Sequence, residues 1–312
     1  MRYIFPKNWR VNLARYDQLA EALHRDARWL KESERSIPAQ YHKVPLKKKN
    51  GDIRWLSVPN AGLKDIQRSI LSNLFNFSFP DHIQGGISKR SIVTNASLHR
   101  GKKWIACLDI SKFFPSVHHT QIKEIFLSLG CSQRIAVALT HFTSHHYELP
   151  QGAPTSPMLA NLILYNLDTN IQRLCKTKHL TYSRYFDDIT ISGNRALDVV
   201  CDKVILIARR EGFRIHKDDK EKFRKTPSWK TQTVTGIVVS RKRLEPSLDF
   251  ILNFEKTIES LKIGDLPVRE FLKTMATAKG MVSFLNSVNA PMAKRFQQTV
   301  ERIDWRDCGL EF

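Results

Sequence analysis

The chain has 312 residues, of which 42% are apolar and 26% are charged, and this composition excludes an intrinsically disordered protein. The length suffices for one large hydrophobic core or two modest ones. The 50 Lys and Arg residues outnumber the 30 Asp and Glu residues, so the net charge is +20. Because Lys and Arg displace the counterions condensed on phosphates, this excess favours a polyanionic partner over the alternative of a generally basic soluble protein.

The cysteines indicate neither a disulfide framework nor a zinc site, because their number is odd and they form no CxxC pair. We expect reduced thiols in a cytoplasmic protein. The first residues lack the apolar stretch of a signal peptide, and no apolar run reaches the roughly 18 residues of a membrane span, so we expect no membrane contact. The five cysteines are Cys107, Cys131, Cys175, Cys201 and Cys308.

The first half of the chain predicts helices around a hairpin and a buried strand. Residues 1–40 show helix-like spacing of apolar side chains. Residues 44–59 predict two strands around the turn signal Asn50-Gly51, and residues 63–77 predict an amphipathic helix. Residues 104–110 are apolar and rich in strand formers, so they predict a buried strand that carries Asp109 near its end.

The second half predicts another strand pair and then helices. Residues 157–174 predict a helix, and residues 180–192 predict two strands joined at Asp187-Asp188. A helix at 199–211, a Lys-rich connection at 217–230 and a strand at 234–240 follow, and beyond Pro246 the pattern is helical. We therefore predict an α+β catalytic body at residues 41–240. An N-terminal helical segment precedes it at 1–40, and a mainly helical unit follows at 241–312.

Two acidic sites stand at the ends of predicted strands: Asp109, and the pair Asp187-Asp188. Nucleotidyl transfer requires carboxylates that hold two Mg²⁺ ions, one to activate the attacking hydroxyl and one to neutralise the triphosphate. A strand end beside a hairpin tip can bring such carboxylates together. Taken alone, an Asp-Asp pair is more often a solvated turn and a strand-end Asp is often a cap, so the surrounding sequence has to decide.

Three segments around these acids resemble the motifs of reverse transcriptases and follow the family's order. Residues 108–116 (LDISKFFPS) resemble the first catalytic motif, residues 149–157 (LPQGAPTSP) resemble the substrate-binding loop, and residues 185–188 (YFDD) resemble the YxDD box. The resemblance covers roughly residues 43–240. It implies a right-hand polymerase whose fingers and palm combine an antiparallel sheet with helices, and whose C-terminal helices form the thumb.

The resemblance assigns roles to single residues. It makes Asp109, Asp187 and Asp188 the catalytic ligands of Mg²⁺. Phe114 stands where the family places an aromatic steric gate against the ribose 2′-hydroxyl, while one ring of the Phe113-Phe114 pair is expected to pack in the core. Gln151 and the backbone of Gly152 are expected to line the nucleotide pocket.

Basic side chains are implied to bind the phosphates of the nucleotide. Lys48 and Arg54 flank the predicted hairpin turn as in the fingers of reverse transcriptases, with a solvated basic hairpin as the alternative. Lys220 has about the spacing of the polymerase lysine near the leaving pyrophosphate, and Lys217 and Lys222 compete with it.

Two further segments resemble the bacterial retron subgroup: residues 95–99 (NASLH) match its NAxxH pattern and residues 234–236 match its VTG pattern. Retron enzymes copy a cognate structured non-coding RNA, prime from a guanosine 2′-hydroxyl and leave branched RNA–DNA. The implied partners are that RNA of msr–msd type, its DNA product, deoxynucleoside triphosphates and a separate effector protein in anti-phage defence. The expected location is the bacterial cytoplasm. The expected RNA-binding residues are Asn95, His99, Val234, Thr235, Gly236, Arg241, Lys242 and Arg243, and the thumb adds Lys273, Lys279, Arg295 and Phe296.

Three alternatives stay open at this point. Instead of a retron enzyme, the chain could be an intron-derived or defence-associated bacterial reverse transcriptase that makes no branched product. It could also be a non-catalytic RNA-binding scaffold. For each basic thumb residue, a solvated helical face is the alternative to an RNA contact. Phe186 departs from the Ala that bacterial relatives often carry, and we expect its ring to pack under the primer end or the incoming nucleotide.

Overall fold

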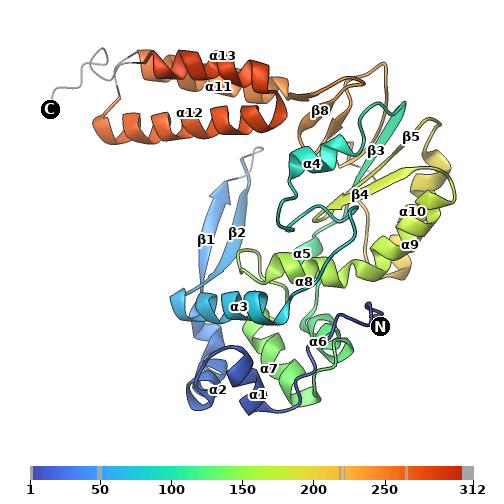
Figure 1. Cartoon of the computed structure of the whole chain (residues 1–312), viewed down its shortest axis with the longest axis vertical. Coiled ribbons are helices and arrows are strands. Elements are labelled where there is room, and N and C mark those ends of the chain that lie inside the picture. The colour runs from blue at the N-terminus through green and yellow to red at the C-terminus, as the bar shows by residue number, and fades with distance from the viewer. Residues whose placement is uncertain (1–2, 48–50, 218, 221, 264–265, 304–312) are drawn as a thin grey trace.

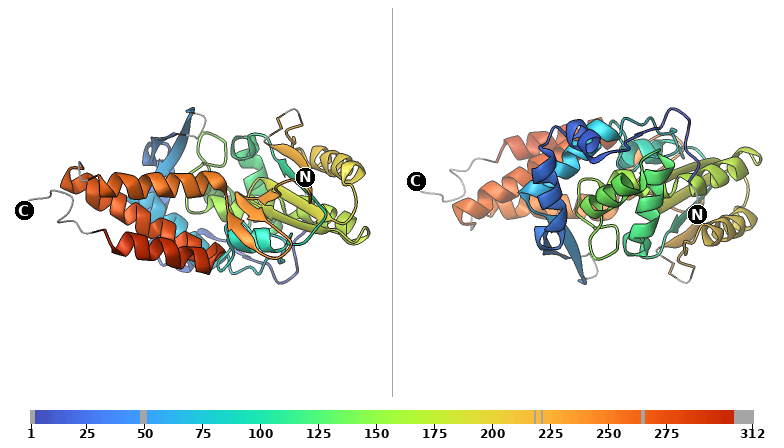
Figure 2. Two further views of the ribbon diagram at one scale, coloured as in Figure 1. Left: turned by 90° about the horizontal axis from the view of Figure 1, so that it is seen from above. Right: turned by 90° about the horizontal axis from the view of Figure 1, so that it is seen from below.

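The computed structural model describes residues 3–47, 51–217, 219–220, 222–263 and 266–303. Lys48 and Asn50, which the sequence assigns to the fingers turn, lie outside these ranges. The described chain is a mixed α+β fold with three antiparallel sheets and a helical C-terminal unit, as expected for a right-hand polymerase (Figure 1). The thumb helices and the palm helices lie at opposite ends of the molecule (Figure 2).

The N-terminal segment packs into the main hydrophobic core. Its elements are α1 (Tyr16–Ala22), α2 (Ala27–Arg35) and the short 3₁₀ helix η1 (Ile37–Gln40), which lie beside α3 (Ala61–Leu74), α6 (His119–Ser128) and α7 (Gln133–Thr143). Trp9, Leu19 and Leu30 are buried in the same core as the palm residues. Side chains cap the helices locally; Asn60, for example, accepts a hydrogen bond from the Leu63 amide at the start of α3.

The predicted hairpin is confirmed as β1 (Tyr41–Lys47) paired antiparallel with β2 (Ile53–Pro59). It extends from α3 toward the thumb (Figure 1). Both strands are largely exposed, as befits a two-stranded sheet that projects from the body.

The palm sheet has the strand order β4-β5-β3-β6, and every pair in it is antiparallel. Alternation along the strands gives the sheet two different faces. Ala106 and Leu108 join the main core, whereas Ile105 and Cys107 face a smaller cluster with Val234 and Ile237. The strands are β3 (Trp104–Asp109), β4 (Thr181–Tyr185), β5 (Asp188–Gly193) and β6 (Phe223–Pro227).

Helices and a small sheet cover the two faces of the palm. On the main-core side lie α8 (Ser156–Ile163), α9 (Tyr165–Lys176) and α10 (Asp198–Arg210). On the other side lie α4 (Ile92–Ser97) and the sheet of β7 (Thr233–Val234), β8 (Ile237–Val239) and β9 (Leu244–Pro246). The short helix α5 (Phe113–Ser116) follows β3 directly.

Three sequence predictions were wrong in detail. The helix expected at 157–174 breaks at the buried Leu164, which no Pro or Gly announces. The strand expected at 234–240 is a hairpin, because Thr235 and Gly236 have φ of 46° and 81° and turn the chain. The Lys-rich connection contains the edge strand β6, whose charged side chains mask its strand character.

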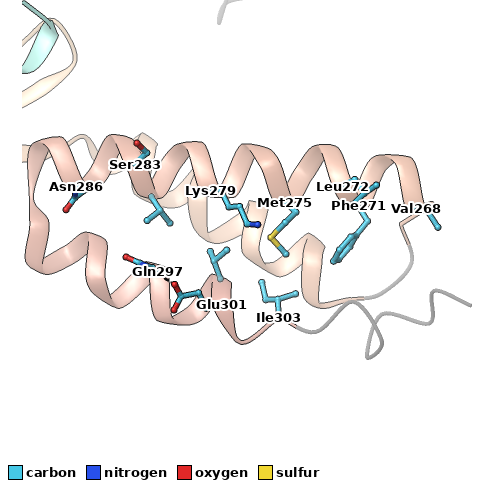
Figure 3. A pocket seen from close by; sticks show the side chains of 12 residues that line it. Val268, Phe271, Leu272, Met275, Lys279, Ser283, Asn286, Gln297, Glu301 and Ile303 are labelled. Atoms are coloured by element: carbon cyan, nitrogen blue, oxygen red, sulfur yellow. Dashed lines mark hydrogen bonds between the residues drawn. The ribbon is translucent and has the colours of Figure 1, made fainter. Parts of the chain in front are cut away.

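The thumb has a core of its own. It consists of α11 (Leu248–Lys262), α12 (Val268–Val288) and α13 (Ala290–Glu301), which pack around Phe254 and Leu285. Phe296 stacks on Phe254 with ring centroids 4.6 Å apart and is half-buried against this core, so its contact with RNA bases stays a prediction. A mainly apolar groove of about 820 Å³ runs between α12 and α13, with Lys279 and Glu301 among its polar lining (Figure 3). Within the described residues, no helix is long and apolar enough to cross a membrane.

Candidate active site

Asp109 and Asp188 lie directly opposite each other on the neighbouring strands β3 and β5. Directly paired residues of antiparallel strands project from the same face, so both carboxylates point away from the main core. Asp187 belongs to the adjoining turn, and its carbonyl accepts a hydrogen bond of 3.0 Å from the Ile110 amide. The register of β3 and β5 therefore brings together the three acids that the sequence singled out.

The acidic turn, residues 185–188, is a two-residue hairpin loop. Tyr185 pairs with Asp188, which leaves Phe186 and Asp187 as the central residues. Phe186 has a φ of 54°, in the left-handed region that few aromatic residues occupy. Other parts of the chain must therefore hold the turn in place.

Two glycines make room for the Phe186 ring. A β-carbon on Gly86 would stand 2.9 Å from Pro157 Cβ and 3.0 Å from Phe186 Cε1, and Gly86 has a φ of +70°. A β-carbon on Gly85 would approach the Phe186 amide nitrogen to 2.4 Å. Real β-carbons do not come this close, so the segment 85–86 requires glycine. The phenylalanine ring, which is larger than the Ala side chain of many bacterial relatives, therefore packs against Gly85 and Gly86.

A buried ion pair fixes the other side of the turn. Arg184 is fully buried and binds the Asp168 carboxylate with Nε at 2.8 Å and Nη2 at 2.7 Å. Its Nη1 donates to the Phe186 carbonyl at 2.8 Å, and its Nη2 also donates to Asn161 Oδ1 at 3.1 Å. Asn161 in turn donates to the Gly85 carbonyl at 2.9 Å. The network ties the acidic turn, the glycine segment and helices α8 and α9 together.

Burial raises the pKa of all three carboxyl groups. Burial, together with the charges of Asp187 and Asp109, raises the pKa of Asp188 to about 7, although part of the Asp188 side chain remains open to solvent. Burial is also the main cause that raises the pKa of Asp109, and burial together with Asp109 raises that of Asp187. Crowded carboxylates of this kind are stabilised by bound cations.

Two basic side chains stand next to Asp109. Lys222 Nζ and His216 Nε2 each lie 3.6 Å from Asp109 Oδ2, and the two nitrogens are 3.2 Å apart. Lys222 borders a pocket of about 310 Å³ whose lining also includes Asp109, Asp188, Thr235 and Gly236. Lys217 and Lys220 are exposed in the same connection. Of the three competing lysines, Lys222 is therefore the one that the structure places beside an active-site acid.

The residues expected in the nucleotide pocket come from three segments of the chain. Phe113 is buried in the core, whereas Phe114 is half-buried, and the two rings pack edge to face with centroids 5.3 Å apart. The Gln151 carbonyl accepts a 2.8 Å hydrogen bond from the Ser57 amide of β2. Gly152 has a φ of +119°, and a β-carbon there would stand 3.0 Å from the Ser57 carbonyl. Glycine thus lets the loop dock on the fingers.

Arg54 lies exposed on β2, and its charge partly offsets the raised pKa of Asp187. The guanidinium is thus electrostatically linked to the acids, as a phosphate-binding residue of this site should be.

The two retron-like segments face each other inside the protein. Asn95 and His99 are fully buried, and Asn95 accepts a 2.6 Å hydrogen bond from the Ser183 hydroxyl. The His99 ring nitrogens bond to Ser192 and Ser183, both at 2.7 Å. Thr235, in the turn between β7 and β8, donates to the Ile92 carbonyl at 3.2 Å. The expected RNA contacts of Asn95, His99 and Val234 stay a prediction. In this structure these three side chains are buried, and Asn95 Nδ2 donates a 3.4 Å hydrogen bond to the Thr235 hydroxyl.

The remaining residues expected to bind RNA are exposed. Arg241, Lys242 and Arg243 form the tip of the connection between β8 and β9, where Arg243 also pairs with Glu245. Lys273, Lys279 and Arg295 are exposed on the thumb helices.

The sequence reasoning missed the supporting residues Asn161, Asp168, Arg184 and His216. A signal existed for Arg184, because an arginine within a predicted buried strand requires a buried acidic partner. Nothing in the sequence alone identified Asp168 as that partner.

The fold and the acidic site together define a polymerase palm. The chain belongs to the reverse transcriptase (RNA-dependent DNA polymerase) family, whose model matches residues 46–235, more than half of the 312 residues. It is 29% identical over 286 residues to the retron Mx162 reverse transcriptase of Myxococcus xanthus, which covers 80% of this chain and 58% of that protein. It is 29% identical over 270 residues to the retron Ec86 reverse transcriptase of Escherichia coli, covering 85% of this chain and 82% of the relative.

The match to the retron Se72 reverse transcriptase of Salmonella heidelberg is 34% identical over 151 residues and covers 48% of this chain and 40% of that protein. The chain thus spans between about two fifths and four fifths of the length of these relatives.

Proposed function

We propose that this chain is the RNA-directed DNA polymerase of a retron. It copies part of a cognate structured RNA into DNA and primes from a guanosine 2′-hydroxyl, so that a branched RNA–DNA product results. The observation that carries the catalytic part is the pairing of Asp109 with Asp188 beside the turn that holds Asp187. Similarity to several retron reverse transcriptases supports the retron part.

Reverse transcriptases use divalent metal ions, and the donor set fits this requirement. Hard carboxylate oxygens lie close together here, burial raises the pKa of all three groups, and the charge of Asp109 also raises the pKa of Asp187 and Asp188. We assign Asp109, Asp187 and Asp188 as the ligands of two Mg²⁺ ions. In the described residues, no three His, Cys, Asp or Glu side chains already form a closed metal-binding cluster, so binding would draw the carboxylates inward. The bound ions would activate the primer hydroxyl and neutralise phosphate charge.

Protein side chains would orient the nucleotide around this centre. Arg54 binds the triphosphate through its planar guanidinium, with Lys48 as the second predicted cation. Gln151 and Gly152 form the pocket wall, and the half-buried Phe114 excludes a ribose 2′-hydroxyl. Lys222 takes the pyrophosphate side in place of Lys220, because its ammonium group lies 3.6 Å from Asp109.

The exposed basic residues of the β8–β9 tip and the thumb would grip phosphates of the RNA. A neighbouring effector protein and a role in anti-phage defence complete the proposal.

The deciding experiment is to purify the protein with its bound nucleic acid, treat the sample with RNase or DNase, and sequence the products. Retron activity predicts DNA joined to RNA through a 2′–5′ bond. DNA without this branch would favour another type of bacterial reverse transcriptase. If the preparation contains RNA alone and extends no added primer, the non-catalytic scaffold is the correct reading.

A further inference from the structure

A tight turn at residues 145–148, in the loop between α7 and α8, holds two aromatic side chains in a strained conformation. His145 N donates to Glu148 O at 3.0 Å and Glu148 N donates to His145 O at 3.1 Å, so His146 and Tyr147 are the central residues. Their φ angles are 50° and 65°. Asn-Gly is the ordinary occupant of such a turn, and histidine tolerates positive φ better than a bulky ring such as tyrosine. Strain that a chain retains points to a task for the side chain.

The Tyr147 ring is exposed to solvent. Its side chain is 71% exposed, and its ring contacts that of His119 with centroids 5.1 Å apart. On the other side of the turn, His145 stacks on Tyr41 of β1 with centroids 4.2 Å apart and an interplanar angle of 21°. The Tyr41 hydroxyl is itself anchored by a 2.8 Å hydrogen bond from Gln67 Nε2. We call this set the ring row: Tyr41, His145, His146, Tyr147 and His119.

The ring row combines neutral rings with nearby cations. Burial, reinforced by His146 and Lys43, lowers the pKa of His145 to about 4, so its ring is uncharged at neutral pH. Burial and neighbouring charges that include Lys123 lower the pKa of His119 as well. The turn's own carboxylate, Glu148, is exposed. Neutral π faces beside lysines match single-stranded nucleic acid, which offers base faces and phosphates at regular intervals.

The position of the ring row indicates which nucleic-acid strand it would contact. Residues 149–152 follow the turn directly, and the Gln151 carbonyl accepts a hydrogen bond from the Ser57 amide of β2. The β1–β2 register places Tyr41 and Lys43 on the same face of the hairpin as Trp55, whose side chain is 56% exposed. The row thus continues onto the fingers, beside the predicted nucleotide pocket.

We propose that the ring row binds the unpaired template RNA ahead of the copied position, with Tyr147 stacked on a nucleobase. This proposal rests on the proposed polymerase function, because only a polymerase holds an unpaired strand at this point.

The test uses the full chain and two primer–template duplexes, one with a short single-stranded template overhang and one blunt. Fluorescence anisotropy measures the Kd of each. Tyr147→Ala should weaken binding of the overhang substrate about tenfold and leave the blunt duplex unchanged, whereas Tyr147→Phe should behave like the unaltered protein. Unchanged affinity for the overhang substrate, or an equal loss on both duplexes, would overturn the proposal.

A second variant separates stacking from support of the fold. His146→Asn combined with Tyr147→Gly removes both rings and suits the backbone of the turn, so the melting temperature should rise or hold. Binding of the overhang substrate should nevertheless weaken. Undiminished binding by this variant refutes the stacking role. Failure of the polymerase function would appear separately, as absence of primer extension by the unaltered protein, since the binding measurements involve no synthesis.

Discussion

Arg184 Nη1 donates a hydrogen bond of 2.8 Å to the carbonyl oxygen of Phe186, the first central residue of the acidic turn. The same guanidinium is neutralised by Asp168, 1% exposed, on helix α9. Helix α9 therefore helps to position the turn that carries Asp187, through the contact of Asp168 with Arg184.

Removal of Asp168 should destabilise the protein and disturb the site. Asp168→Asn leaves a fully buried guanidinium without its counter-charge, and breaking a buried pair in this way costs about 3–5 kcal/mol. Urea unfolding measures the change. The matched control is Asp198→Asn, which breaks the exposed pair with Lys225 and should shift the midpoint little. Similar shifts for both variants would contradict a special role of the buried pair.

Asp187→Asn should abolish metal-dependent cDNA synthesis while RNA binding survives. Replacing a metal ligand should cost more than the roughly 100-fold loss seen when a ligand's supporting partner is removed. Primer extension on an RNA template gives the rate, and a filter-binding assay gives the RNA affinity. Asp202→Asn, an exposed acid on α10, serves as the control and should keep full activity. Undiminished synthesis by Asp187→Asn would refute the metal assignment.

The adjacent rings Phe113 and Phe114 should respond in opposite ways to truncation. Phe114→Ala should increase ribonucleotide incorporation relative to deoxynucleotides, because the clash with the 2′-hydroxyl disappears. Phe113→Ala should instead lower the free energy of unfolding by about 3–5 kcal/mol, since this ring is 1% exposed in the core. Single-nucleotide incorporation with ATP against dATP, together with urea unfolding, separates the two effects. If discrimination is unchanged in Phe114→Ala, the gate lies elsewhere.

His99 should make the protein sensitive to mild acid. Burial lowers the pKa of His99 to about 3 in the folded state, whereas an unfolded histidine titrates near about 6.5. Between these values the unfolded chain binds a proton that the folded chain excludes, so this contribution to stability is complete above pH 6.5 and declines as the pH falls. From pH 7 to pH 5 we expect a loss of about 2 kcal/mol from this residue.

Urea unfolding at both pH values measures this effect. His99→Asn should flatten the dependence, and His24→Gln, at an exposed position, should not. Equal slopes in the unaltered protein and His99→Asn would show that another group is responsible.

The sequence was most informative where local signals and motif order agreed. The strand ending at Asp109, the hairpin at Asp187-Asp188 and the fingers hairpin were all confirmed as elements. The break at Leu164 could not be predicted, because neither Pro, Gly nor a capping side chain marks it in the sequence.

The burial of His99 is a second feature that could not be predicted from the sequence. Its partners Ser183 and Ser192 are distant along the chain, and only the tertiary fold brings them to the imidazole. The packing of Phe186 against Gly85 and Gly86 could not be predicted for the same reason, because glycines in a loop do not indicate which side chain packs against them.

The hydrogen bonds around α4 define which parts of this protein can be exchanged as a block. Asn95 and His99 bond to the strands of the acidic hairpin, and Thr235 bonds back to α4. Phe284 and Val288 of the thumb pack on the same small cluster as Ala96 and Val234. A thumb grafted from a relative would therefore meet a mismatched surface unless residues 92–99 and 233–239 travelled with it. The exchanged segments of a chimaeric enzyme should therefore be chosen so that these contacts stay together. A junction placed only at the start of the thumb would separate residues that pack in one cluster.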